Sequence, residues 1–71
     1  MYRGTILYFS DDGRIAHIWC AKAGNPLFRA READFPELWP TLLVGTNVVF
    51  DGKTGNGQWV VSLNLAPDGE V

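Results

Sequence analysis

Short runs of β-branched, aromatic and aliphatic residues, separated by glycine, proline and aspartate, extend along most of this chain. Five of these runs have the length and composition of β-strands, and none continues with the spacing of an amphipathic helix. In chain order, strands are predicted at Arg3–Ser10, Ile15–Trp19, Leu27–Arg31, Gly45–Phe50 and Gln58–Leu65.

The segments between the runs carry turn-forming residues. Asp11-Asp12-Gly13 predicts a tight turn that joins the first two strands into a hairpin, because aspartate bonds its own backbone and glycine adopts positive φ. Ala23 to Pro26 predicts a second break. The proline-bounded connection from Glu32 to Pro40 predicts no more than a single helical turn. The segment from Asp51 to Gly57 contains three glycines and predicts a hairpin loop.

Five short strands with glycine-rich turns favour an all-β barrel or small sandwich, because closing a sheet removes its exposed edges. The 71 residues allow one hydrophobic core only. We therefore predict a single domain over residues 1–66, followed by a flexible tail at 67–71.

Composition and charge limit the classes of protein to consider. Hydrophobic residues make up 46% of the chain, which is too much for intrinsic disorder. The only cysteine is Cys20, so no intramolecular disulfide can form and a reducing compartment, the cytoplasm, is expected. There is neither a signal peptide nor a run of about 18 apolar residues that would predict a membrane span. A net charge of −2 means that any affinity for nucleic acid must come from a local patch.

The order of residues resembles that of the cold-shock domain, a family of OB-fold barrels that bind single-stranded nucleic acid. Gly4 to Ser10, G-T-I-L-Y-F-S, is similar to the family's opening G-T-V-K-W-F-N, and Gly13 to Ile18 falls on its first ribonucleoprotein motif, K-G-F-G-F-I. Leu27 to Ala30 falls on the second motif, V-F-V-H, and Gly45 to Phe50 matches G-x-x-V-x-F. The resemblance covers about residues 3 to 65 and implies a five-stranded antiparallel barrel of the OB-fold type.

The same resemblance implies a binding surface on the first three strands. Tyr8 stands where the family has a base-stacking tryptophan, and Ile15 and His17 stand where it has two stacking phenylalanines. Stacking and a basic groove together give single-strand binding, and three arginines are candidates for the phosphate contacts. The candidate residues are Tyr8, Arg14, Ile15, His17, Phe28, Arg29 and Arg31.

The register of the third strand has two solutions. Side chains alternate along a strand, so Phe28 lies on one face and Arg29 and Arg31 lie on the other. The ungapped match to the family would turn Arg29 inward, and burying an unpaired guanidinium costs several kcal/mol, on the order of 3–5. We therefore prefer a slip of one residue that buries Phe28 and exposes both arginines.

Catalysis and metal binding find little support in the sequence. His17 and Cys20 are three residues apart on a strand and point to opposite faces, so they cannot exchange a proton. The loop from Gly52 to Gly57 lacks the spacing of a phosphate-binding loop, and one histidine with one cysteine supplies no metal-ligand set. We predict no enzyme activity, no cofactor and no metal. The tryptophans are expected in the core or at its rim, with at most one exposed: Trp19, Trp39 and Trp59.

Two functions remain open. The first is weak binding of single-stranded RNA or DNA by a divergent cold-shock-like domain that regulates transcription or translation. The second is a protein-interaction module that regulates a transcription or replication enzyme, because net charge −2 and the apolar Ile15 and Ala30 also suit a protein interface. Either a monomer or a weak homodimer fits the sequence.

Overall fold

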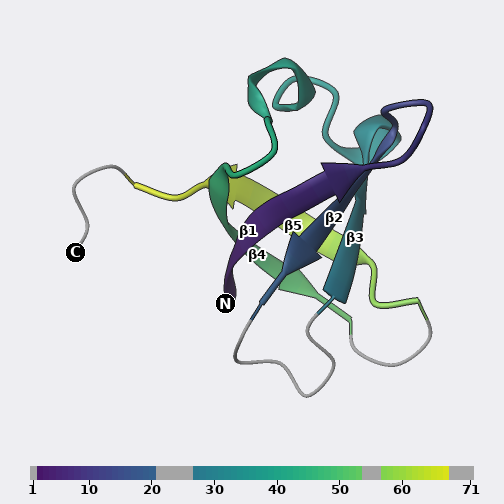
Figure 1. Ribbon diagram of the computed structural model, residues 1–71. Coiled ribbons are helices and arrows are strands. Elements are labelled where there is room, and N and C mark those ends of the chain that lie inside the picture. Colours follow the sequence, from purple (N-terminus) through teal and green to yellow (C-terminus); the bar gives the residue numbers. More distant parts are fainter. Residues whose placement is uncertain (1, 21–26, 54–56, 68–71) are drawn as a thin grey trace.

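Five strands and two short 3₁₀ helices make up the structure, a computed structural model that describes residues 2–20, 27–53 and 57–67. The predicted break at Ala23–Pro26 and most of the predicted tail lie outside the described residues. Figure 1 shows the elements. Their bounds are β1 Tyr2–Phe9, β2 Ile15–Trp19, β3 Leu27–Arg31, η1 Glu32–Asp34, η2 Trp39–Thr41, β4 Asn47–Gly52 and β5 Val60–Leu65.

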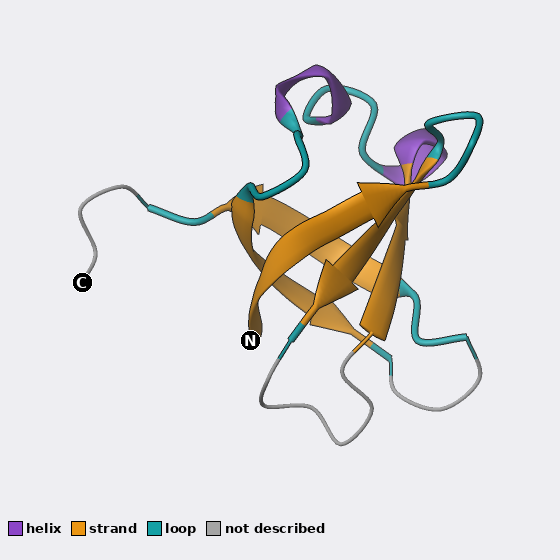
Figure 2. Cartoon of the chain, viewed as in Figure 1, coloured by secondary structure: helices purple, strands orange, loops and turns teal. Residues whose placement is uncertain are grey.

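All five strands belong to one sheet in the order β3-β2-β1-β4-β5, and every neighbouring pair is antiparallel. The sheet curls on itself (Figure 2) into a compact body with a radius of gyration of 11.1 Å. Its edge strands β3 and β5 approach each other where an isolated parallel bridge joins Arg29 to Trp59, the residue before β5, and no continuous ladder joins the two strands. The prediction of an all-β domain of five antiparallel strands is confirmed, and regular pairing does not close the sheet.

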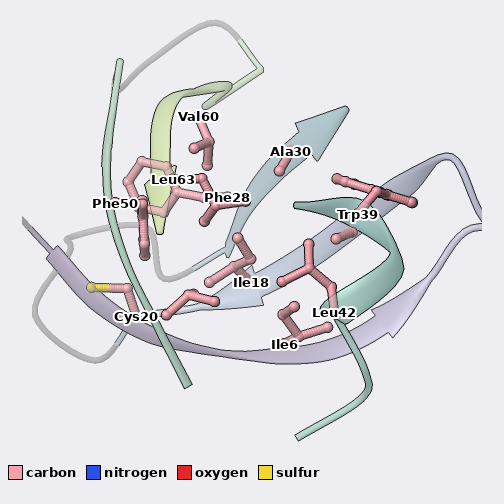
Figure 3. Close-up of a cluster of buried hydrophobic side chains, with 12 residues drawn as sticks. Ile6, Ile18, Cys20, Phe28, Ala30, Trp39, Leu42, Phe50, Val60 and Leu63 are labelled. Carbon is pink, nitrogen blue, oxygen red and sulfur yellow. The ribbon is translucent and has the colours of Figure 1, made fainter. Parts of the chain in front are cut away.

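The core fills the inside of this curl (Figure 3), where Trp39 and Leu42 lie at one end and Cys20 lies at the other. The side chains of the core follow the alternation of the strands, since every second side chain of β2 and of β3 points inward. Among the described residues, the buried apolar side chains are Ile6, Ala16, Ile18, Cys20, Phe28, Ala30, Trp39, Leu42, Val48, Phe50, Val60 and Leu63.

The structure chooses the slipped register for β3. Phe28 is fully buried opposite Ile18, and Ala30 is buried opposite Ala16. Arg29 and Arg31 consequently lie on the outer face, where their charges remain partly hydrated. The preference for the slip is confirmed, and its physical reason is the high cost of an unpaired guanidinium in the core.

The connection after β3 contains two 3₁₀ helices rather than the single turn expected. Pro40 occupies the first turn of η2, where its missing N–H breaks no hydrogen bond. Trp39 Nε1 donates to the Gly13 carbonyl at 2.8 Å, and the Glu32 N–H donates to the Arg14 carbonyl at 2.9 Å. These bonds fix the connection to the β1–β2 turn. Along the described stretches, no helix is long and apolar enough to cross a membrane.

The predicted β1–β2 turn forms as expected, with Gly13 at φ +72°. The Ser10 hydroxyl donates to Asp12 Oδ1 at 2.6 Å, and the Arg14 N–H donates to the same oxygen at 3.0 Å. Both bonds stabilise the ionised carboxylate, and they lower the pKa of Asp12 from its ordinary value.

Two strands begin later than predicted. β4 starts at Asn47 because Gly45, with φ +92°, belongs to the preceding turn. β5 starts at Val60 because Gln58 has φ +47°, which interrupts extended backbone. The buried side chain of Gln58 donates from Nε2 to the Leu27 carbonyl at 2.6 Å, so it helps to join the beginnings of β3 and β5.

The burial of Phe28 gives a stability prediction. Phe28→Ala should lower the free energy of unfolding by about 3–5 kcal/mol, because it removes a fully buried ring and leaves a cavity. Urea denaturation followed by tryptophan fluorescence measures the change. Tyr8→Ala is the control, since that side chain is 49% exposed and its loss should cost less. Equal stability of the two variants would place Phe28 outside the core.

Candidate nucleic-acid interface

A row of side chains crosses the outer face of the sheet from β1 to β3. Tyr8 pairs with His17 across β1 and β2, and His17 pairs with Arg29 across β2 and β3. The rings of Tyr8 and His17 stack with centroids 4.3 Å apart and an angle of 14° between their planes. The row therefore combines two flat rings with one guanidinium on a partly exposed surface.

A bulge in β1 turns Tyr8 outward. Ile6 pairs with Ile18 and Tyr8 pairs with His17, so Leu7 is an extra residue between two successive pairs. Strict alternation would send Ile6 and Tyr8 to the same face, but Ile6 is buried and Leu7 and Tyr8 are both exposed. The bulge thus re-aims the tyrosine from the core side to the solvent side.

The row ends at Trp59, which lies beside the start of β5. The guanidinium carbon of Arg29 lies 4.3 Å from the centroid of the indole, and that of Arg31 lies 4.7 Å from it. Both distances are within the range of a cation–π contact. Arg29 is held further by the hydrogen bond from its Nε to the Gly57 carbonyl at 3.1 Å. Trp59 consequently brings two positive charges together on one face of the molecule.

Only glycine fits at position 57. Its φ is +80°, and a Cβ there would lie 2.7 Å from Trp59 Nε1 and 3.0 Å from Arg29 Nη2. A side chain would therefore displace the indole or the guanidinium. Gly57 allows the backbone to approach the Arg29–Trp59 contact closely enough to accept its hydrogen bond.

A second row lies next to the first, nearer the β1–β2 turn. Ile15 pairs with Arg31, and Arg14 precedes this pair at the end of the turn. Arg31 also donates from Nε to Asp34 Oδ2 at 3.2 Å in an exposed ion pair. Arg14, Ile15 and Arg31 all line one hollow at this end of the sheet.

The structure brings together six of the seven residues predicted for the site and excludes Phe28. Phe28 was a stacking candidate by resemblance, but its side chain is 0% exposed and packs against Phe50 in the core. It cannot stack on a nucleic-acid base. The prediction that Ala30 forms part of a protein interface is also wrong, because Ala30 is fully buried.

Trp59 is the site residue that sequence reasoning did not assign. It was expected in the core or rim, and it lies half-buried under the two arginines, whereas Trp39 is buried and Trp19 is exposed. The two-residue spacing of Arg29 and Arg31 predicts that they share a face. Nothing local in the sequence points from these arginines to an indole about thirty residues further along the chain.

No metal site is found in the part of the chain that the structure describes, where no three residues of the types His, Cys, Asp and Glu gather. Cys20 is fully buried, and His17 lies half-buried on the outer face. The partners of His17 are a tyrosine ring and an arginine, so its surroundings suit stacking and charge contacts rather than metal coordination.

Comparison of this chain with protein-family models, with curated proteins and with solved structures finds no match. The function must therefore be inferred from the geometry and chemistry of the row of side chains on the outer face.

The environment of His17 gives a prediction of pH dependence. Partial burial, and to a smaller extent the nearby charge of Arg29, lowers the pKa of His17 below 6.5. The unfolded chain then binds a proton more readily than the folded chain, so the free energy of unfolding should decrease as the pH falls from above 6.5 through the lowered pKa. Urea denaturation at neutral pH and at pH values below 6.5 measures this slope.

His17→Gln is the matched variant, because His17 is the only histidine of the chain. Its stability should change less with pH over the same window. An identical slope in both proteins would assign the pH dependence to other groups.

Proposed function

We propose that this protein binds single-stranded RNA or DNA weakly through the outer face of β1, β2 and β3, as a regulator of transcription or translation. The observation that carries the proposal is the row of Tyr8, His17 and Arg29, extended by Arg31 on Trp59. Aromatic rings that accept stacked bases, beside cations that accept phosphates, are the two requirements of a single-strand binding surface.

The arrangement of the strands supports a cold-shock-like barrel of the OB-fold type. The resemblance of the sequence to that family covers about residues 3 to 65. The sheet is curled and has five antiparallel strands in the order β3-β2-β1-β4-β5. The Arg29–Trp59 bridge, with the Arg29 N–H donating to the Gln58 carbonyl at 3.0 Å, brings the edge strands to the point where such a barrel would close. OB-type barrels bind oligonucleotides on the face that carries this surface.

Weak binding follows from the same contacts. Tyr8 and His17 already stack on each other, so each ring has only one face left for a base. Arg29 and Arg31 each use one donor within the protein, on Gly57 and Asp34. The net charge of −2 adds no long-range attraction for phosphates. A few short-range contacts must therefore supply the affinity.

A salt titration tests the proposed function. With two or three phosphates bound by Arg14, Arg29 and Arg31, the logarithm of the affinity for a short single strand should fall against the logarithm of salt concentration with a slope of about −1.4 to −2.1. Fluorescence anisotropy with labelled oligonucleotides at low salt measures it. An absence of binding at the lowest salt concentration would refute the proposal.

Two variants distinguish binding at the assigned surface from non-specific adsorption of the oligonucleotide. Tyr8→Ala should weaken binding by about tenfold, which corresponds to one stacked base. Leu43→Ser removes another exposed side chain, in the segment before β4, and should bind like the parent protein. Equal affinities of Tyr8→Ala and Leu43→Ser would contradict the surface that we assign.

A protein-interaction module is the second candidate, and one observation favours it. Leu43 and Val44 are 68% and 64% exposed, and Leu7 on the β1 bulge is also exposed. The Gly45 N–H donates to the Ile6 carbonyl at 2.8 Å, so this turn lies against β1 near the bulge. Exposed aliphatic groups that lie together are typical of protein-binding surfaces.

The two candidates predict opposite effects of the same variants. If a protein is the ligand, a nuclease-treated pull-down should recover a stoichiometric partner with the parent chain and with Tyr8→Ala, and Leu43→Ser should lose it. If nuclease treatment abolishes recovery of the partner, the interaction depends on nucleic acid, and this outcome supports the first candidate. Sedimentation at several concentrations checks whether the partner is a second copy of this chain.

A further inference from the structure

A hollow of about 480 Å³ lies beside the candidate surface, between the β1–β2 turn and η1. The Ile15–Arg31 pair that forms part of its wall is the next outward-facing pair after His17–Arg29 along β2 and β3, because the Ala16–Ala30 pair between them is buried. A strand of nucleic acid that lies on the first row would therefore reach the hollow with its next nucleotide. The lining residues are Asp12, Arg14, Ile15, Arg31, Glu32, Ala33 and Pro36.

The walls combine flat apolar contacts with groups of both charges. Ile15, Ala33 and Pro36 supply the apolar part, against which a planar ring can pack. Arg14 and Arg31 can only donate hydrogen bonds. The two carboxylates of the hollow, those of Asp12 and Glu32, can only accept them. A phosphate would meet repulsion from those carboxylates. A ligand with an apolar ring face, donors on one edge and acceptors on another fits this lining better.

The two carboxylates of the hollow, those of Asp12 and Glu32, differ in the number of hydrogen bonds that they already accept within the protein. Asp12 accepts hydrogen bonds from the Ser10 hydroxyl and the Arg14 N–H, which commits it to the turn. Glu32 is half-buried, and among the described residues its carboxylate has no hydrogen-bond or ion-pair partner. Both bonds to Asp12 end on its Oδ1, so Glu32 is the carboxylate of the hollow whose two oxygens are both left for a ligand.

The position of Glu32 is set before any ligand arrives. The Glu32 N–H donates to the Arg14 carbonyl at 2.9 Å, and the Phe35 N–H closes η1 on the Glu32 carbonyl at 3.0 Å. Arg31, the preceding residue, is fixed by Trp59 and Asp34. A hollow whose side chains are already held in place binds a ligand without a large entropic cost of ordering those side chains.

We propose that this hollow binds a guanine base of the single strand, with Glu32 as the acceptor for its N1–H and N2 amino group. Guanine presents two adjacent donors on its Watson–Crick edge, which match the two oxygens of one carboxylate. Its O6 and N7 are acceptors that arginine recognises. Arg14 and Arg31 line the hollow, and because a guanidinium has five N–H donors they can donate to these atoms as well as to a phosphate of the same strand. Adenine, cytosine and thymine each lack one half of this pattern.

The proposal rests on single-strand binding by the neighbouring surface, and the experiment separates the two claims. The probes are a short oligothymidine, the same oligonucleotide with one central guanine, and the same with hypoxanthine, which lacks the N2 amino group. The parent protein should bind the guanine probe about tenfold more tightly than oligothymidine, and hypoxanthine should lose much of that gain.

Glu32→Gln tests the assigned acceptor, because an amide cannot accept from both guanine donors. The ratio of guanine to oligothymidine affinity should fall towards one in this variant. Glu37→Gln is the matched control, since it removes the same charge from an exposed glutamate of the same connection that does not line the hollow. It should keep the ratio of the parent protein.

Each result decides one claim. If oligothymidine binds and guanine adds no affinity, the guanine site is refuted while the binding surface stands. If both glutamate variants keep the parent ratio, Glu32 is not the acceptor and the proposal fails. If no probe binds, the proposed function fails together with the inference.

Discussion

An unpaired guanidinium cannot be buried at an acceptable cost, and this constraint determines how β3 lies in the sheet. Because β3 alternates, the outward position of Arg29 and Arg31 requires Phe28 and Ala30 to enter the core. Pairing with β2 then places His17 beside Arg29. The hydrophobic core and the candidate surface are thus two faces of one register, and neither can change without the other.

The approach of β5 to β3 completes the surface. Trp59 reaches the arginines because Gly57 and Gln58 have positive φ, which interrupts extended backbone beside β3 just before β5 begins. The ring of the indole then attracts both guanidinium groups. The same contact helps to bring the sheet edges together and to hold the cations in place for a ligand.

Local pattern was enough for most of the fold. The five strands, the turn at Asp12 and Gly13 and the choice of register on β3 follow from alternation, turn chemistry and the cost of burying charge, all of which act between near neighbours. Resemblance to a family was less reliable for the site. It offered Phe28 as a stacking residue, although the same alternation that exposes the arginines buries this ring.

The sequence by itself determined an all-β chain with one core, a first hairpin, and Tyr8, His17 and the arginines as candidates for one surface. Only the tertiary structure decided which rings and charges meet. The bulge at Leu7, the stacking of Tyr8 on His17 and the contact of Trp59 with the arginines depend on pairing between separate strands. Such contacts join residues distant in sequence, so no local periodicity records them.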